Sequence, residues 1–240
     1  MRIKAVIAYN GNKFKGFQKQ SSTGKTVAGT LEKALVSLGI ECQITSSGRT
    51  DAGVHATGQV IHFDIPDFWD DLSKLKNHLN GKLDGIYIKY ISKVNNNFHA
   101  RFSAKRRTYR YIFKSTTPSI FEEDFISHIP IQNISKLEEA LQCFVGEHDF
   151  GYFLKTGSNT KNSVRHIYRT YYICRGDYHF IYFEANGFLR AQVRMMIDFA
   201  VRIANYELAI AQLQEQLTLK VTHNQRLASP QGLYLSRVIY

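Results

Sequence analysis

Between two segments of strand-like composition, residues 41–47 and 59–64, the chain reads Ser46-Ser47-Gly48-Arg49-Thr50-Asp51-Ala52-Gly53-Val54-His55-Ala56. Two glycines bracket an arginine and an aspartate, and glycine allows positive φ and the close approach of a ligand to the backbone. A turn between two strands presents such side chains with little conformational freedom. Taken alone, the turn fits a polar loop with a structural Arg49–Asp51 ion pair better than it fits a catalytic site.

The segments around this turn alternate between strand and helix patterns. Residues 2–9 are rich in β-branched and small residues, which is typical of a strand. Thr26 can cap a helix in which Val27, Leu31 and Leu35 recur at helical spacing. A second helix follows from residue 72, and residues 86–94 alternate as a further strand. The first half therefore predicts the order β-α-β-β-α-β of a ferredoxin-like unit.

The second half shows the same order of patterns without detectable sequence repetition. Its predicted elements are strands at 108–114, 166–174, 178–184 and 233–240, and helices from 135, over 188–204 and ending at 217. We therefore predict an α+β protein of two ferredoxin-like units, residues 1–103 and 104–240. Their mainly antiparallel sheets are expected to flank a basic cleft.

Composition favours a folded protein that binds a polyanion. The 240 residues are 44% hydrophobic, too many for a disordered chain. The 31 lysines and arginines against 20 acidic residues leave a net charge of +11, which is typical of nucleic-acid partners. The run Lys105-Arg106-Arg107-Thr108-Tyr109-Arg110-Tyr111 sets cations beside rings, as RNA surfaces require. Charges near Met1 and the lack of a long apolar run predict a cytoplasmic protein without a membrane span.

Several enzyme classes lack their motifs here. The three cysteines are scattered without a CxxC pair, and no HExxH pattern occurs, so we expect no metal. Gly24-Lys25-Thr26 resembles the end of a P-loop, but Lys19 stands where that motif needs glycine. Neither a GxSxG elbow nor a GxGxxG turn is present. Asp51 remains as a lone acid, which suits a nucleophile or a base.

At this point the sequence resembles a family, the TruA-type tRNA pseudouridine synthases. The run from Gly48 to Ala56, with Gln59 and His62-Phe63 after it, is similar to the family signature. Collinear blocks extend the resemblance over nearly the whole chain. They are Tyr9-Asn10-Gly11, Phe14, Gly16-Phe17-Gln18, Gln20, Thr26-Val27, Leu31-Glu32, Phe98-His99-Ala100-Arg101-Phe102-Ser103-Ala104, Tyr109-Arg110-Tyr111, Gly146-Glu147-His148-Asp149-Phe150, Gly157-Ser158, Arg165-His166-Ile167, Ala185-Asn186-Gly187-Phe188-Leu189-Arg190, Gln192-Val193-Arg194, Gly232-Leu233-Tyr234-Leu235, Val238 and Tyr240.

The resemblance implies an isomerase that converts uridines at tRNA positions 38 to 40, in the anticodon stem-loop, into pseudouridine without cofactor or metal. It implies a homodimer whose partner is tRNA. By the same resemblance Asp51 is the catalytic aspartate, Arg194 its ion-pair partner, and Tyr109 the ring stacked on the flipped uracil. Substrate-binding roles are implied for Arg49, in base flipping, for Leu233 as an apolar floor, and for Arg190 and His55.

Alternatives and departures remain. A non-catalytic RNA-binding protein of two ferredoxin-like modules fits the charge and aromatics equally well, but it has no use for Asp51 beside phosphates. A nucleoside or glycoside hydrolase would need a second acid, and none stands out. Whether Asp51 attacks or abstracts a proton stays open. Residues 195–199 and 204–207 lack glycines usual in the family, and residues 115–128 lack an expected tryptophan.

Overall fold

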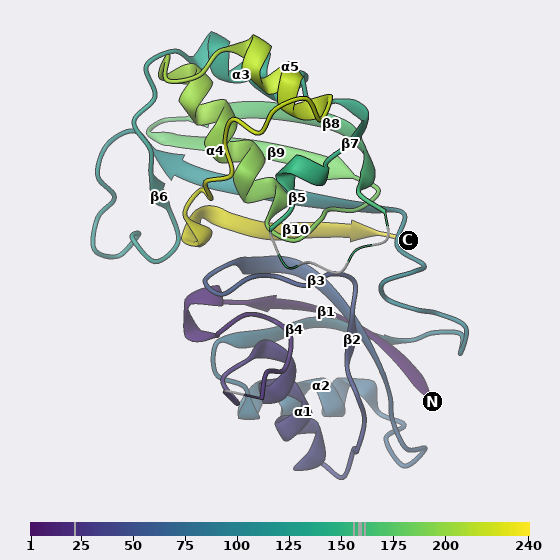
Figure 1. Ribbon diagram of the computed structural model, residues 1–240. Coiled ribbons are helices and arrows are strands. Elements are labelled where there is room, and N and C mark those ends of the chain that lie inside the picture. The colour runs from purple at the N-terminus through teal and green to yellow at the C-terminus, as the bar shows by residue number, and fades with distance from the viewer. Residues whose placement is uncertain (22, 156, 158–159, 161) are drawn as a thin grey trace. The chain divides into compact units, whose positions relative to one another are not determined.

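The computed structural model describes residues 1–21, 23–155, 157, 160 and 162–240. Five α-helices and ten strands occur within these residues, and the strands pair mostly antiparallel (Figure 1). The chain divides into two compact units. Unit 1 comprises Met1–Lys105 and Tyr234–Tyr240, and unit 2 comprises Arg106–Leu233.

Unit 1 contains a sheet in which the central strands are antiparallel. Strand β1 pairs with β4 on one side and β3 on the other. The other edge of β3 pairs with β2, antiparallel, and with β10, parallel. The bounds are β1 Arg2–Tyr9, β2 Thr45–Ser46, β3 His55–Asp64, β4 Ile86–Lys93 and β10 Leu233–Ile239.

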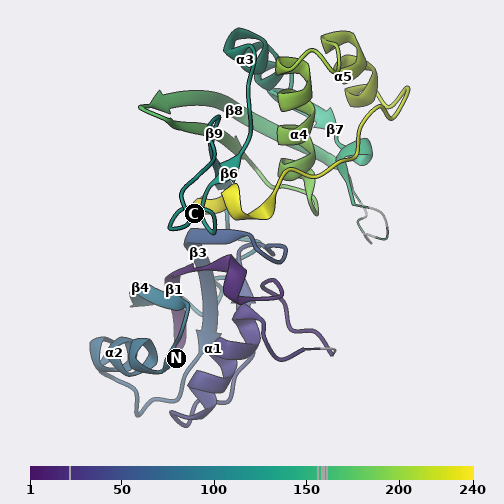
Figure 2. The ribbon, with the colours of Figure 1, turned by 90° about the vertical axis from the view of Figure 1, so that its left-hand side faces the viewer.

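Helices α1, Val27–Val36, and α2, Leu72–Lys82, lie on one face of this sheet (Figure 2). Each begins at a polar residue with extended backbone whose side chain accepts from the first turn, Thr26 from the Gly29 N–H and Asp71 from the Lys74 N–H. Every second residue of β1 is buried, because alternate side chains of a strand point to the same face. The sheet therefore contributes one apolar face to the core.

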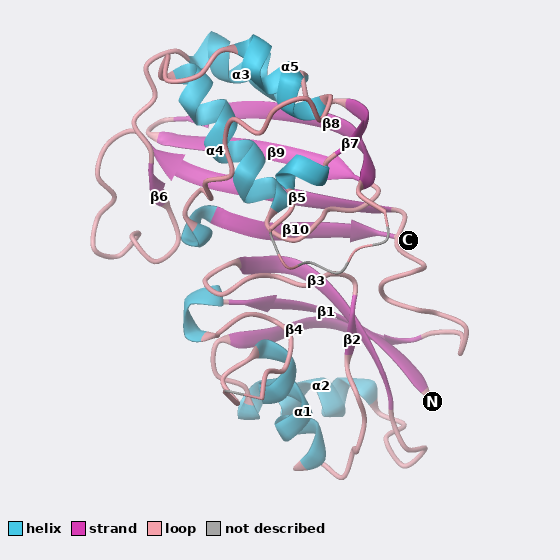
Figure 3. Ribbon diagram, viewed as in Figure 1, coloured by secondary structure: helices cyan, strands magenta, loops and turns pink. Residues whose placement is uncertain are grey.

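Unit 2 contains a second antiparallel sheet, in the order β5-β9-β8-β7, with the short β6 parallel to β5 (Figure 3). The strand bounds are β5 Arg106–Lys114, β6 Ser127–His128, β7 Gly146–Asp149, β8 Val164–Arg175 and β9 Tyr178–Ala185. The helices are α3 Ile134–Gln142, α4 Gln192–Ala204 and α5 Ile210–Leu217.

The core of unit 2 is aromatic. Tyr111 and Phe113 of β5 alternate toward it and are fully buried. Phe183 of β9 and Phe199 of α4 are fully buried as well. Burial raises the pKa of Tyr111 to about 12, and its hydroxyl donates to Ser127 Oγ at 2.8 Å. A buried hydroxyl that has a hydrogen-bond partner costs little stability, so the Tyr111 ring can pack in the core.

The structure confirms the predicted mixed α+β class with mainly antiparallel pairing, and it corrects several segment boundaries. The strand predicted over 59–64 begins already at His55. Residues 41–47 do not form one strand, because only Thr45–Ser46 pair with β3. The Ile44 N–H instead donates to Glu32 Oε1 of α1 at 3.1 Å. The helix predicted over 188–204 begins only at Gln192, because Ala191 has a φ of 63° and interrupts helical geometry. Of the family-like blocks, Ser158 lies outside the described residues.

Candidate active site

Asp51 lies in the loop between β2 and β3, and hydrogen bonds of polar side chains fix the first residues of that loop. Asp51 is half-buried and Arg49 is exposed. Gln59 of β3 reaches back and donates from Nε2 to the Gly48 carbonyl at 2.8 Å, while its Oε1 accepts from the Ser47 hydroxyl at 2.6 Å. The Val60 N–H also donates to Gln59 Oε1, at 3.2 Å. Gln59 is fully buried, and a buried polar side chain without hydrogen-bond partners would cost stability.

The middle of the loop is held by two residues of the N-terminal segment. The Phe17 N–H donates to the Thr50 carbonyl at 3.1 Å, and the Tyr9 hydroxyl shares a 2.8 Å hydrogen bond with Thr50 Oγ1. Burial raises the pKa of Tyr9 to about 12, so this phenol keeps its proton at neutral pH. Both neighbours of Thr50 in the chain, Arg49 and Asp51, are thereby carried on a fixed backbone.

The end of the loop depends on glycine at two positions. Gly53 has a φ of 77°, which favours glycine, and the Val54 N–H donates to the Asp51 carbonyl at 3.2 Å. A Cβ on Gly11 would lie 2.3 Å from the Val54 carbonyl oxygen, so only glycine fits there. A Cβ on Gly48 would meet nothing within 4 Å, so Gly48 is not required for space.

His55, predicted to bind substrate, lies at the start of β3 and is 1% exposed. Its Nδ1 accepts from the Gly11 N–H at 3.0 Å, and its ring stacks on Tyr234 with centroids 4.7 Å apart. These contacts join the N-terminal segment to the Asp51 loop and to β10. They are contacts of a positioning residue, and substrate binding by His55 stays a prediction.

In unit 2, Tyr109 and Leu233 are buried at strand positions. Tyr109 of β5 is 8% exposed and meets the Phe188 ring edge to face, with centroids 5.2 Å apart. Leu233 opens β10 and is 4% exposed. A Cβ on Gly232 would lie 2.7 Å from the Ile112 carbonyl oxygen, so the close approach of the preceding turn to β5 needs glycine. Tyr109 and Leu233 thus both lie on backbone that the strands hold in place.

Arg190 and Arg194 flank the start of α4. Arg194 lies in the first turn of the helix, and its Nε donates to the Ala228 carbonyl at 2.6 Å. Gln192 stabilises the turn before it, because its Oε1 accepts from the Leu189 N–H at 2.7 Å. Arg190 is exposed. The guanidinium of Arg194 is therefore tethered on one edge to a backbone carbonyl.

The predicted site residues fall into two groups, each within its own unit. Arg49, Asp51 and His55 share one loop and the strand that follows it. The second group, from unit 2, comprises Tyr109, Arg190, Arg194 and Leu233.

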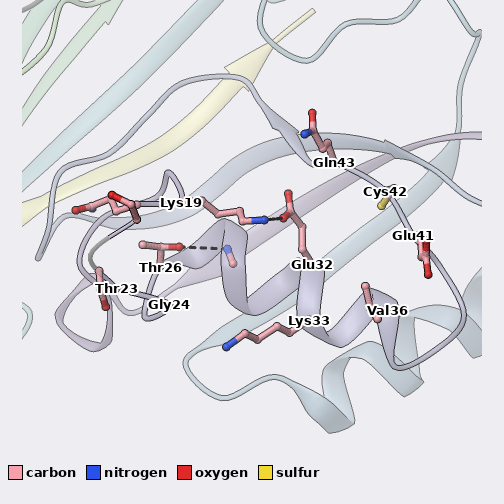
Figure 4. Close-up of a pocket in the computed structure, with 13 residues that line it drawn as sticks. Lys19, Thr23, Gly24, Thr26, Glu32, Lys33, Val36, Glu41, Cys42 and Gln43 are labelled. Carbon is pink, nitrogen blue, oxygen red and sulfur yellow. Dashed lines mark hydrogen bonds and ion pairs between the residues drawn. The ribbon is translucent and has the colours of Figure 1, made fainter.

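A cavity of about 830 Å³ lies elsewhere in unit 1, beside α1 (Figure 4). Its lining includes Thr26, Lys33 and a Lys19–Glu32 ion pair of 2.8 Å, and none of the predicted site residues. Within the described residues, no group of three or more His, Cys, Asp or Glu side chains could hold a metal ion. None of the helices in the part of the chain that the structure describes is long and apolar enough to cross a membrane.

A family model described as tRNA pseudouridine synthase matches residues 5–103 and 140–240. The chain belongs to the tRNA pseudouridine synthase family. As a member it is an isomerase that forms pseudouridine in tRNA. The Asp51 loop and residues Arg190, Arg194 and Leu233 fall inside the matched ranges, whereas Tyr109 falls between them.

Relatives of full length support the family assignment. A protein of Helicobacter hepaticus named tRNA pseudouridine synthase A is 41% identical over 99% of this chain and 98% of its own length. A protein of the same name from Campylobacter jejuni is 36% identical over 100% of this chain and 100% of its own length. Another, from Pseudothermotoga lettingae, is 40% identical over 99% of this chain and 98% of its own length. Among solved structures, a chain of a Cbf5-Nop10-Gar1 complex aligns with a TM-score of 0.34 and 12% identity, over 83% of this chain and 45% of that chain. That likeness is too small to carry an argument.

Sequence patterns assigned no role to the residues that hold the synthase's Asp51 loop. Tyr9, Gly11 and Gln59 were visible only as members of family-like blocks. Their function as clamps depends on contacts between distant positions, for instance Tyr9 with Thr50 and Gly11 with His55. The signal that could have found them is their residue type, because buried glutamine and tyrosine need hydrogen-bond partners.

Proposed function

We propose that this tRNA pseudouridine synthase acts on uridines at tRNA positions 38 to 40, in the anticodon stem-loop, and that Asp51 is its catalytic carboxylate. The observation that carries the assignment is the clamped loop: Thr50 is held through its hydroxyl by Tyr9 and through its carbonyl by Phe17. A catalytic group must be held close to its productive geometry by the residues behind it. The backbone that carries Asp51, next in the chain, is held in this way.

The reaction explains why a lone carboxylate suffices. The glycosidic C–N bond breaks, the base turns, and a C–C bond forms to the same sugar carbon, so nothing is gained or lost. One proton leaves the ring carbon and one is taken up by the ring nitrogen. Asp51 begins this sequence by attack or by proton abstraction, and both roles require an ionised carboxylate.

The remaining side chains receive roles that match their chemistry. Arg194, whose Nε donates to the Ala228 carbonyl, is proposed to pair with Asp51, because a planar guanidinium matches the geometry of a carboxylate. Tyr109 is proposed to stack on the flipped uracil, and Leu233 to form an apolar floor. Arg49, exposed on the clamped loop, is proposed to assist base flipping, since a flat cation stacks on bases and binds phosphate.

Arg190 and His55 complete the set as proposed substrate-binding residues. Arg190 is exposed beside the first turn of α4, where a cation can meet a phosphate. His55 would act through the backbone that it holds, because its ring is buried.

The wider architecture is proposed to be two ferredoxin-like halves along the chain, residues 1–103 and 104–240, flanking a basic cleft. The last residues of the second half, Tyr234–Tyr240, belong to compact unit 1. Unit 1 supports this proposal through its strand neighbours β4-β1-β3-β2 and two helices on one face. The net charge of +11 supports a polyanionic partner. We further propose a cytoplasmic homodimer that needs neither metal nor cofactor.

The decisive experiment incubates the full chain with unmodified tRNA transcripts and maps pseudouridine at each position. Pseudouridine confined to positions 38 to 40 is the expected result. Modification only at other positions would contradict the proposed substrate site. Tight tRNA binding without any pseudouridine would favour the non-catalytic RNA-binding alternative.

A further inference from the structure

A phenylalanine on the surface of unit 1 has no role in the proposed catalytic set. Phe102 is 76% exposed and lies in the segment between β4 and the end of unit 1. Single exposed apolar side chains are ordinary on protein surfaces, so exposure alone assigns nothing. Two further features set Phe102 apart: the ring beneath it and the charge around it.

The Phe102 ring rests on His99, with centroids 4.3 Å apart and planes inclined by 28°. His99 is fixed in turn, because its Nδ1 lies 3.2 Å from the backbone N–H donors of Arg101 and Phe102. The His99 N–H donates to Ser103 Oγ at 3.0 Å. A ring already ordered in this way loses little conformational entropy when another ring stacks on it.

The turn that carries Phe102 is attached to the sheet of unit 1. The Ala100 N–H donates to Nδ1 of His62, on β3, at 3.1 Å, and the Ala100 carbonyl accepts from the Tyr240 hydroxyl at 2.8 Å. Burial, aided by the charges of Arg2 and His99, lowers the pKa of His62. The lowered pKa favours the neutral imidazole, and the bond from the Ala100 N–H requires the tautomer in which Nδ1 has no proton.

The chain segment around Phe102 is basic, and Asp64, the carboxylate beside it, is paired with Arg2. The Arg101 guanidinium lies 5.6 Å from the Phe102 ring, and Lys105 is exposed three positions further on. The Lys4 ammonium lies 5.9 Å from the Phe98 ring in the same segment. Residues 95–105 include no aspartate or glutamate. A ring for a base beside cations for phosphates is the arrangement that single-stranded RNA requires.

Phe68 supplies the contrast within the same unit. It is 67% exposed, close to the exposure of Phe102. However, Asp67, Asp70 and Asp71 surround it in the chain, and carboxylates repel a polyanion. Two similarly exposed rings therefore lie in chain segments of opposite charge, Phe102 in a basic one and Phe68 in an acidic one.

We propose that Phe102 is a stacking platform for an unpaired tRNA base other than the uridine that reacts, and that Arg101 and Lys105 bind the adjacent phosphates. The platform rests on the tRNA substrate of the proposed function. An anticodon stem-loop supplies unpaired bases next to the modified positions, and such bases stack on exposed aromatic side chains.

The test measures binding of an unmodified anticodon stem-loop to the full chain carrying F102L, F102Y or F68L. F102L, which keeps apolar volume but removes the ring, should weaken binding about 5- to 150-fold, the range for loss of one stacked base. F102Y and F68L should stay within about twofold of wild type. R101Q should reduce the slope of log affinity against log salt by about 0.7, whereas F102L should leave that slope unchanged.

A fluorescent base analogue, 2-aminopurine, placed in turn at each unpaired loop position identifies the contact. One position should be quenched by wild type, F102Y and F68L but not by F102L. Wild-type affinity in F102L would overturn the platform, as would an equal loss of binding to a fully paired RNA. A change of subunit association in F102L without a change in RNA affinity would also overturn it. Pseudouridine mapping with the wild-type chain separates these outcomes from failure of the proposed function.

Discussion

The two units hold their proposed active-site residues in different ways. In unit 1, Arg49 and Asp51 share one short loop, and bonds from Tyr9, Phe17 and Gln59 fix its backbone. In unit 2 the proposed residues come from separate elements, so that only the completed fold can order them. The difference predicts that a single backbone clash in the Asp51 loop lowers activity. In unit 2, activity should fall chiefly when a side chain that takes part in the reaction is replaced.

The largest effect outside Asp51 is expected at Tyr109. Beyond stacking, we expect the Tyr109 hydroxyl to relay the proton that the rearrangement moves from carbon to nitrogen. Tyr109→Phe should therefore slow single-turnover pseudouridine formation about 10²- to 10⁴-fold, the usual scale of general acid–base catalysis. tRNA affinity should change little, since phosphate contacts dominate it. Tyr109→Leu should be slower still, because the ring is lost as well. Wild-type rates in both variants would remove Tyr109 from the active site.

A backbone clash tests the clamped loop. Gly11→Ala would place a methyl group 2.3 Å from the Val54 carbonyl oxygen. We expect an activity loss of about 10²-fold, as for a small misplacement of a catalytic group, and a fall of about 1–3 kcal/mol in the free energy of unfolding. Gly48→Ala is the matched control, because its Cβ would meet nothing within 4 Å. Equal rates and equal urea midpoints for the two variants would show that the loop is not clamped at Gly11.

The smallest effect concerns the turn before α4. Ala191 has a φ of 63°, a conformation that costs about 1–2 kcal/mol for residues with a Cβ. Ala191→Gly should leave the free energy of unfolding unchanged or raise it by up to about 1 kcal/mol, because the relieved strain outweighs the entropy of glycine. Ala191→Val should lower it by about 1–2 kcal/mol. Chemical denaturation measures both, and identical stability of the Val variant and wild type would contradict the strain.

The same contrast explains what the sequence could predict. The alternation of β1 and the leucines of α1 are local patterns, so the α+β class and the element order of unit 1 could be predicted directly. The short strands β6 and β7 of unit 2 were not predicted. The Asp51 loop was recognisable because its arginine, aspartate and glycines are adjacent in the chain. The late start of α4 was not predictable, because residues 188–191 have the apolar and basic composition of a helix while Ala191 adopts a left-handed conformation.

Long-range polar contacts were also not predictable from the sequence. The shortening of β2 follows from a bond between Ile44 and Glu32, and the clamp on Thr50 follows from Tyr9. Neither pair has a spacing that a strand or helix pattern would reveal. Such contacts exist only after the core has formed, which is why composition and periodicity miss them.

One measurement tests the central claim most directly: single-turnover pseudouridine formation by Asp51→Asn on an unmodified tRNA, with tRNA affinity measured alongside. The amide keeps the shape of the side chain but can act neither as nucleophile nor as base. We predict a rate lowered by more than about 10³-fold, with affinity equal to or slightly tighter than wild type because one negative charge is gone. A rate within about tenfold of wild type would contradict the assignment of Asp51 as the catalytic carboxylate.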